Sequence, residues 1–343
     1  MVGELEGISR RGAEMTSRER IQAALRGDPV DRPPISLWHH FPGRDMTGET
    51  LAQSTLEFQR RLSLDLIKLM PTGMYSVMDY GVQIRLDEGP SGTTTLAAGP
   101  IHEPADWERL PDVSPRRGSL KEAVEAVRLV RAALGPDTPL VQTLFSPLTM
   151  AAKMVGGAIE PFIAESEDQL KVALEKMAAD TVAFGLACLE TGADGFFFAT
   201  QHATRSALPE GVYKRLGVPY DLKILEALRS GAWCTILHLH GVGPLFELAD
   251  LYPVDAVSWH DRESEPSLAQ AMSRTRRCLI GGIQRRGAVV TGGPEEVMRE
   301  VRDAIAQTGG RRLIVAPACV IPPAAPFENL LAARRAVERL GWG

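Results

Sequence analysis

Short apolar runs alternate with helical patterns along almost the whole chain, and this alternation restricts the fold more than any other feature. Eight runs have the length and composition of buried β-strands, and they span residues 35–40, 65–71, 139–145, 195–201, 234–240, 256–261, 278–284 and 313–319. Amphipathic helical patterns separate most of them. Strands alternating with helices form parallel βα units, so the eight runs predict an α/β protein built as a single (β/α)8 TIM barrel.

Two segments depart from the alternation. Residues 82–100 place alternating β-type residues around Gly-Pro-Ser-Gly, which predicts a β-hairpin inserted after the second strand. Residues 1–15 are polar without periodicity, and we expect a disordered leader there. No linker or internal repeat divides the rest, so residues 16–343 are predicted to form one barrel domain.

Composition excludes several classes of protein. The net charge of −5 and the lack of basic tracts argue against a nucleic-acid binder. The apolar runs are too short to cross a membrane. The cysteines are far apart and do not form a disulfide framework, which predicts a cytoplasmic protein; they are Cys188, Cys234, Cys278 and Cys319.

Polar residues collect at the ends of the predicted strands. In a TIM barrel the active site lies at the C-terminal ends of the strands, so these residues are candidates for function. Six of the seven histidines are among them, the exception being His102. The strand-end candidates are His39, His40, Gln201, His202, His238, His240, Trp259, His260, Asp261, Gln284 and Cys319.

His238 and His240 are the strongest pair within this set. Side chains two positions apart on a strand point to the same face, so both rings can lie at the barrel mouth. Together with Cys319 they offer a donor set suited to zinc, with a fourth position open for water or substrate. A pair of hydrogen-bonded structural histidines is the alternative. Lys68, inside an apolar strand, predicts either an ion pair or a substrate contact.

The sequence resembles the uroporphyrinogen decarboxylase superfamily. The likeness starts with SRERIQAALRGDPVDRPPISLW and continues through FSPLTMAAKMVGG (145–157), HLHG (238–241), GGI (281–283) and APACVIPPAAPFENL (316–330). Its order and spacing hold from about residue 16 to 341. The resemblance implies a TIM barrel and one of two chemistries, either cofactor-free decarboxylation of uroporphyrinogen or zinc-dependent methyl transfer involving a corrinoid.

Where the decarboxylases carry their catalytic groups, this chain differs. Their arginine-rich M-R-Q-A-G-R segment is replaced by WHHFPGR, and Pro71-Thr72 stands in place of their substrate-binding aspartate. Lys153 aligns with their tyrosine, Gln201 with their serine and Cys319 with their late histidine. A polyanionic tetrapyrrole with inward N–H groups requires arginines and a central carboxylate. The resemblance therefore favours the other chemistry.

The zinc methyltransferases of the superfamily have H-x-C after strand five and a cysteine after strand eight. Here His238-Leu239-His240 and Cys319 occupy these places, so the resemblance implies that these three residues hold zinc. Two imidazoles and one thiolate leave the ion with a net charge of +1, which makes it more electrophilic than a two-thiolate site. His260 and Asp261 would act as acid or base or support the ligands. The pocket would be shaped by His39, His40, Lys68, Gln201, His202, Trp259 and Gln284.

The resulting hypothesis is a methyltransferase that moves a methyl group between a corrinoid or other carrier and a small acceptor activated on the metal. The corrinoid would arrive on a separate partner protein, because the chain has no additional cobalamin-binding domain. A metal-free decarboxylase or lyase acting on a carboxylic acid is one alternative, with His39 and His40 binding the anion. A non-catalytic ligand-binding barrel is the other.

Overall fold

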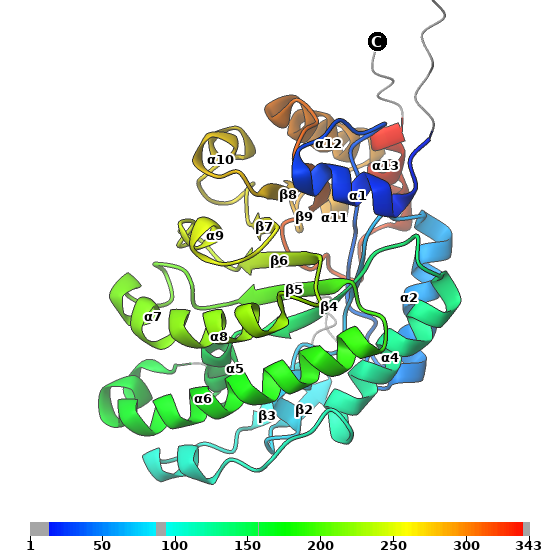
Figure 1. Ribbon diagram of the computed structural model, residues 1–343. Coiled ribbons are helices and arrows are strands. Elements are labelled where there is room, and N and C mark those ends of the chain that lie inside the picture. The colour runs from blue at the N-terminus through cyan, green and yellow to red at the C-terminus, as the bar shows by residue number, and fades with distance from the viewer. Residues whose placement is uncertain (1–13, 87–93, 157, 339–343) are drawn as a thin grey trace, which may run out of the picture.

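The computed structural model describes residues 14–86, 94–156 and 158–338. Seven parallel strands form one curled sheet in the order β1-β4-β5-β6-β7-β8-β9 (Figure 1). The strands are β1 (Ile67–Leu69), β4 (Leu140–Phe145), β5 (Gly195–Thr200), β6 (Cys234–Leu239), β7 (Ala256–Trp259), β8 (Cys278–Ile283) and β9 (Leu313–Pro317). Every residue of these strands is buried, as expected for a parallel sheet covered by helices.

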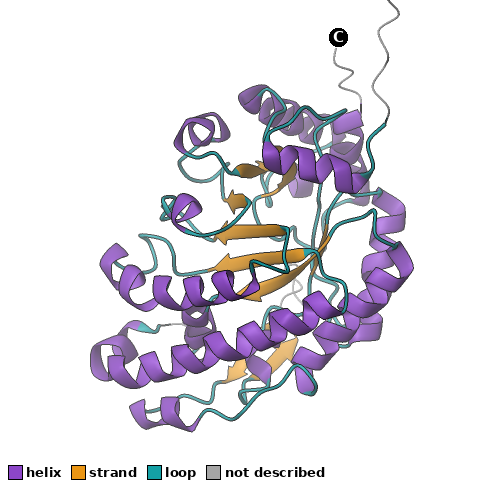
Figure 2. Ribbon diagram, viewed as in Figure 1, coloured by secondary structure: helices purple, strands orange, loops and turns teal. Residues whose placement is uncertain are grey.

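Helices surround the outer face of this sheet (Figure 2). Helices α4 and α6 pack against β4, whereas α10 and α12 pack against β8. The longer helices are α1 (Ser17–Arg26), α2 (Gly48–Leu62), α4 (Gly118–Leu134), α5 (Pro147–Met154), α6 (Glu160–Glu190), α8 (Val218–Leu228), α12 (Pro294–Thr308) and α13 (Phe327–Glu338). The shorter ones are α3 (Tyr75–Met78), η1 (Pro104–Arg109), α7 (Glu210–Leu216), α9 (Leu248–Leu251), α10 (Leu268–Arg274) and α11 (Ala288–Thr291).

The first helix begins where the sequence indicates. The Thr16 hydroxyl accepts a hydrogen bond from the Glu19 amide, and the Glu19 carboxylate accepts one from the Thr16 amide. This capping box satisfies two backbone donors that the first turn leaves without a helical partner. Gly27 ends the helix with φ 79°, a left-handed conformation that glycine adopts without strain.

The predicted strand at 35–40 is not a full strand, which corrects the expected number of eight. Only Ile35 forms a β-bridge, and its partner is Val315. The amide of Ser36 donates to the Val315 carbonyl at 2.9 Å, and the Ile35 carbonyl accepts from the Asp65 amide at 2.9 Å. Pro33 and Pro34 have no N–H to extend this pairing. The segment therefore hydrogen-bonds both β9 and Asp65, two positions before β1, without becoming a strand in its own right.

The predicted insertion contains two paired strands. β2 (Gln83–Leu86) and β3 (Thr94–Ala98) are antiparallel and form a separate two-stranded sheet. The turn expected between them, at 87–93, lies outside the described residues. Gly99, directly after β3, lies so close to α5 that a Cβ there would meet the Met154 carbonyl oxygen at 1.8 Å. The two-stranded sheet is thus seated on the end of α5. Most of the predicted leader, up to residue 13, also lies outside the described residues.

A buried ion cluster ties the N-terminal segment to the start of β1. The Asp65 carboxylate is fully buried and accepts hydrogen bonds from the guanidinium groups of Arg20 at 2.6 Å and Arg32 at 2.6 Å. Asp65 Oδ2, which pairs with Arg32, also accepts a hydrogen bond from the Ile35 amide at 2.9 Å. Asp31 pairs with Arg20 at 2.6 Å, so both charged residues of the Asp31-Arg32 pair take part. These contacts hold the segment before Ile35 in position.

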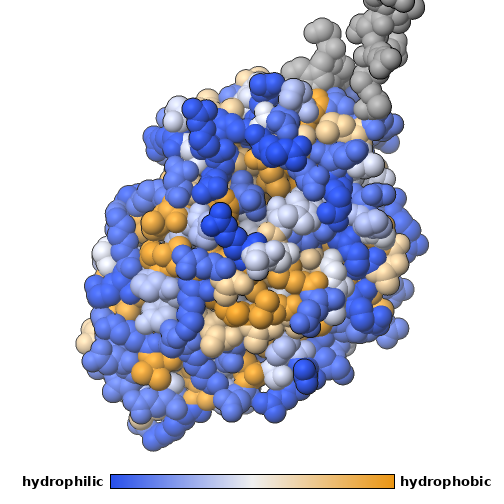
Figure 3. Space-filling model, viewed as in Figure 1, coloured by the Kyte–Doolittle hydropathy of each residue, from blue (hydrophilic) through white to orange (hydrophobic). Residues whose placement is uncertain are grey.

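Hydrophobic residues on the face shown in Figure 3 form separate patches divided by hydrophilic ones. Few large apolar side chains are exposed in the part of the chain that the structure describes, and they are Leu86, Val172, Leu186, Val242 and Leu251. Among the described helices, none combines the length and hydropathy needed to span a bilayer.

Candidate active site

A cavity of about 370 Å³ opens where the parallel strands end. Its volume is typical of a site for a small molecule. Aromatic residues form much of its wall, namely Trp38, Phe145 and Phe197. Six residues singled out from the sequence contribute to the lining: His40, Lys68, Gln201, His238, His240 and Cys319.

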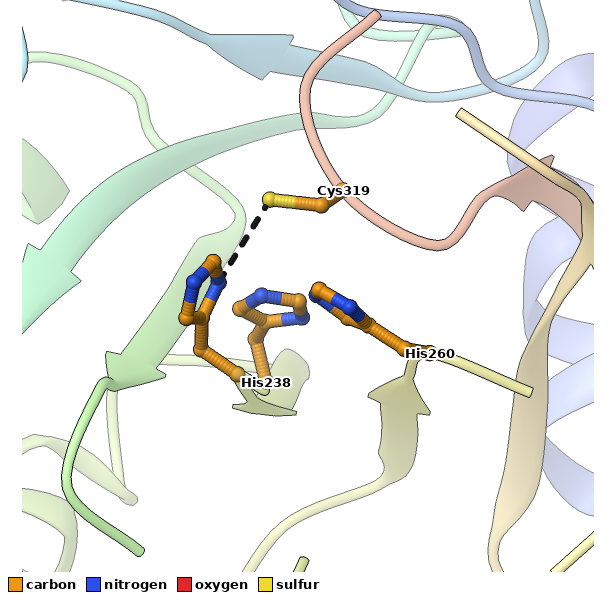
Figure 4. Close-up of side chains that lie close together, drawn as sticks. His238, His260 and Cys319 are labelled. Atoms are coloured by element: carbon orange, nitrogen blue, oxygen red, sulfur yellow. Dashed lines mark hydrogen bonds between the residues drawn. The ribbon is translucent and has the colours of Figure 1, made fainter. Parts of the chain in front are cut away.

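Four potential metal ligands meet at the inner side of this cavity. One donor atom from each of His238, His240, His260 and Cys319 lies within 4.8 Å of the other three. Figure 4 shows the side chains of His238, His260 and Cys319 directed toward one another. Cys319 Sγ lies 3.6 Å from His240 Nδ1. The cluster thus unites the three predicted ligands with His260, which the sequence indicated as an acid or base.

Contacts outside the cluster hold two of the rings. His238 Nδ1 is 3.3 Å from the Ser258 hydroxyl, and His260 Nδ1 is 3.2 Å from a Glu263 carboxylate oxygen. The Phe197 ring stacks on His238 with 5.1 Å between centroids. A partner at Nδ1 fixes the ring orientation and leaves Nε2 for a ligand. Among the described residues, His260 Nε2 is buried and has no hydrogen-bond partner.

The electrostatics favour a thiolate at the centre of the cluster. Burial alone would raise the pKa of the Cys319 thiol, but the neighbouring side chains of His238, His240 and His260 outweigh this and hold the pKa well below its usual value. Burial lowers the pKa of His238 to about 4, against an opposing contribution from Cys319. A thiolate beside the neutral imidazole of His238 matches the protonation states that zinc ligands require. The donor set therefore fits a zinc ion.

Two lysines, the buried Lys68 and the half-buried Lys153, face the same cavity from outside the cluster. Lys68 comes from β1, and Lys153 comes from the C-terminal end of α5. Burial lowers the pKa of each amine to about 7. From the sequence, Lys153 was assigned no role in the pocket, and Glu263 was missed; Arg285, which lines the cavity, follows Gln284 at the end of a predicted strand but was assigned no role. A lysine within an apolar stretch, the signal that identified Lys68, also marks Lys153.

The remaining predicted site residues have described side chains that lie outside the cavity lining. The Trp259 indole donates to the Pro266 carbonyl at 2.7 Å and packs on Phe246. The Asp261 carboxylate accepts from the Gly282 amide at 3.1 Å, and its burial raises its pKa to about 6.

His39, His202 and Gln284 also lie outside the described lining. The His39 ring packs against Phe41 and Phe58. The backbone N–H of Gln284 donates to the Glu300 carboxylate at 3.1 Å. His202 is partly buried beside the cavity residue Gln201. These three residues were predicted to shape the pocket, but the residues next to them in the chain line it instead, namely His40, Gln201 and Arg285.

The fold and the site define an α/β protein with a cavity and a cluster of potential metal ligands at the ends of its parallel strands. The sequence profile of the family Uroporphyrinogen decarboxylase (URO-D) matches residues 16–340, so the chain belongs to this family. The family resemblance seen in the sequence is thereby confirmed.

Relatives in the family are enzymes of two kinds, and the chain is accordingly an enzyme. Methylcobamide:CoM methyltransferase MtaA from Methanosarcina barkeri is 22% identical over 339 residues, covering 93% of this chain and 97% of that protein. Uroporphyrinogen decarboxylase from Alkalilimnicola ehrlichii is 26% identical over 356 residues, covering 94% of each. A solved methyltransferase from Methanosarcina mazei superposes with a TM-score of 0.82 at 21% identity, covering 95% of this chain and 99% of that one, and shows the same fold.

Proposed function

We propose that this protein is a zinc-dependent methyltransferase that transfers a methyl group between a corrinoid and a small acceptor bound in the cavity. The observation that carries the proposal is the meeting of His238, His240, His260 and Cys319 within 4.8 Å. The similarity to a methylcobamide:CoM methyltransferase over 93% of the chain supports the same reaction class. We also infer that the Pro34–Ser36 segment closes the sheet into a (β/α)8 barrel with the β2–β3 pair as its insertion, within one domain that begins at residue 16.

We assign His238, His240 and Cys319 as the zinc ligands. The low pKa of Cys319 and the partner of His238 at Nδ1 support this set. When bound, zinc would lower the pKa of an acceptor thiol or hydroxyl and so supply a stronger nucleophile at neutral pH.

His260 is assigned as the group that takes up the proton of the acceptor. Its Nε2 is buried in the cluster without another partner among the described residues, and Glu263 lies 3.2 Å from its Nδ1. A carboxylate at that position stabilises the imidazolium once the proton has moved. Asp261 contacts the β8 backbone instead, so Glu263 is the better candidate to position His260.

In the transfer itself, the deprotonated acceptor attacks the methyl carbon and forms the new bond. The corrinoid leaves with the electron pair of the bond that breaks. We propose that the corrinoid is presented by a separate partner protein at the mouth of the cavity.

A metal-free carboxy-lyase is a second candidate, supported by one observation. Lys68 and Lys153 face the cavity and could bind a carboxylic acid. This function gives no role to the low pKa of Cys319 or to the unpartnered His260 Nε2.

Incubation of the purified protein with methylcobalamin and a panel of small thiols tests the proposal. We expect loss of the methylcobalamin absorbance together with methylated thiol, abolished by a chelator and restored by zinc. Release of CO₂ from a small acid that is insensitive to the chelator would instead establish the lyase. Ligand binding without turnover of either kind would leave a non-catalytic barrel.

A further inference from the structure

We propose that the cavity binds a small organic anion, recognised by the ammonium groups of Lys68 and Lys153 and enclosed by apolar walls. The proposal names the chemical class of the acceptor and therefore rests on the proposed function.

The charges of the lining are unbalanced. Lys68, Lys153 and Arg285 line the cavity together with the Cys319 thiolate, whereas no aspartate or glutamate is found among its described lining residues. Arg285 lies 3.8 Å from Glu263 and is thus partly compensated. Neither lysine forms an ion pair with a carboxylate in the described parts of the chain, and the negative group that raises the pKa of Lys68 against the effect of burial is Cys319. An ammonium group shielded from water without a carboxylate partner is costly, so an anion from outside would be bound favourably.

Lys68 is the deeper of the two lysines. It is 7% exposed, and its Nζ lies 4.2 Å from the centroid of the Phe197 ring and 5.1 Å from that of Trp38. Its contact with the Met70 sulfur, at 2.6 Å, is to a weak acceptor. The Phe197 ring that it touches also stacks on His238. An anionic group held by Lys68 would therefore lie beside the histidine–cysteine cluster.

Lys153 has a similar environment at another part of the wall. Its Nζ lies 3.4 Å from the centroid of the Phe145 ring and donates to the Gly73 carbonyl. Burial lowers the pKa of both lysines to about 7, and a bound anion would favour their charged forms. Because both lysine amines would become more fully protonated when an acid binds, the cavity should bind the acid much more tightly than its uncharged analogue.

The size and polarity of the cavity indicate what kind of molecule carries the acidic group. A space of about 370 Å³ with aromatic and methionine walls fits a compact acid with an apolar or aromatic body. Two lysines without a carboxylate partner match one or two acidic groups. They do not match a tetrapyrrole with eight carboxylates, which needs several arginines.

Calorimetric titration of the full-length protein with phenylacetate and with the uncharged phenylacetamide tests the proposal. We expect phenylacetate to bind about tenfold more tightly or better, with or without a chelator. Lys68→Met and Lys153→Met should each remove most of this preference. Lys121→Met, which alters an exposed lysine on α4, is the matched control and should preserve it. Equal binding of the acid and the amide, or an unchanged preference in both cavity variants, would overturn the proposal.

Thermal unfolding separates recognition from a structural role. Because methionine has a similar shape and removes a buried charge, both cavity variants should keep or raise the melting temperature while they lose phenylacetate binding. A fall in melting temperature together with an unchanged preference would show that the lysines are structural. Lysine-dependent phenylacetate binding by a protein that holds no metal would contradict the proposed function and leave this inference standing.

Discussion

Cys319 Sγ and His240 Nδ1 lie 3.6 Å apart although 79 positions separate the two residues in the chain. Cys319 follows β9 and His240 follows β6, so β7 and β8 lie between the strands that carry them. Only the curl of the sheet brings these strand ends together. The contact therefore depends on the fold, and the chemistry proposed for the site depends on the contact.

Replacing His260 by glutamine should reduce methyl transfer about 10²–10⁴-fold, because the variant loses the proposed proton acceptor. Zinc content should stay at the wild-type level, since His260 is not one of the three assigned ligands. Rates with methylcobalamin and metal analysis of the same sample measure both effects. Glu263→Gln should give a smaller loss, because it removes only the group that positions the ring. Loss of zinc in His260→Gln would show that His260 is a ligand.

Replacing Asp65 by asparagine should lower the free energy of unfolding by about 3–5 kcal/mol. The change leaves the guanidinium groups of Arg20 and Arg32 without their shared buried counter-charge. Urea unfolding measures the loss. The matched control is Asp28→Asn, which removes an exposed pair with Arg26 and should change the stability by less than about 0.5 kcal/mol. Similar effects of the two variants would contradict the role given to the buried cluster.

The stability of the protein should fall with rising pH because of Asp221. Burial raises the pKa of this carboxyl from 3.8 to about 7, although the hydroxyls of Tyr213 and Tyr252 donate to it. A raised pKa favours folding while the carboxyl is protonated. This contribution is complete below about pH 4 and is lost as the pH rises to about 7.

Asp221→Asn removes this titration and should be more stable than the wild type at pH 8, by about 2 kcal/mol. At pH 5 the advantage should be much smaller. Urea unfolding of both proteins at the two pH values provides the comparison. A constant difference between them would mean that Asp221 does not titrate in this range.

Much of the fold could be predicted because buried parallel strands are nearly continuous apolar runs. The run at 234–240 corresponds closely to β6, which ends at Leu239. The run at 35–40 is equally apolar, but only Ile35 pairs. Hydrophobicity reports burial and not backbone pairing, and two prolines precede this segment. Apolar patterning alone therefore could not distinguish it from a strand.

The sequence predicted which strand ends contribute to the site, but it did not always predict which of two adjacent residues faces the cavity. His40 lines the cavity, whereas His39 packs against Phe58 on the other side of the segment. Ser258 and His260 face the cluster, so Trp259 between them faces the helices. Adjacent side chains in extended backbone point in opposite directions. Which of the two faces the cavity can be decided only when the direction of one residue in the same strand is known. The His238–His240 pair indicated this direction for its own strand and for no other.

Zinc analysis of protein purified without added metal measures directly whether the histidine–cysteine cluster holds a zinc ion. We expect close to one equivalent of zinc in the wild type and loss of most of it in His240→Ala. His39→Ala, which alters a histidine outside the cavity lining, is the control and should retain the metal. A wild-type protein that carries no zinc and does not bind it when it is supplied would contradict the account, as would a His240→Ala variant with an undiminished zinc content.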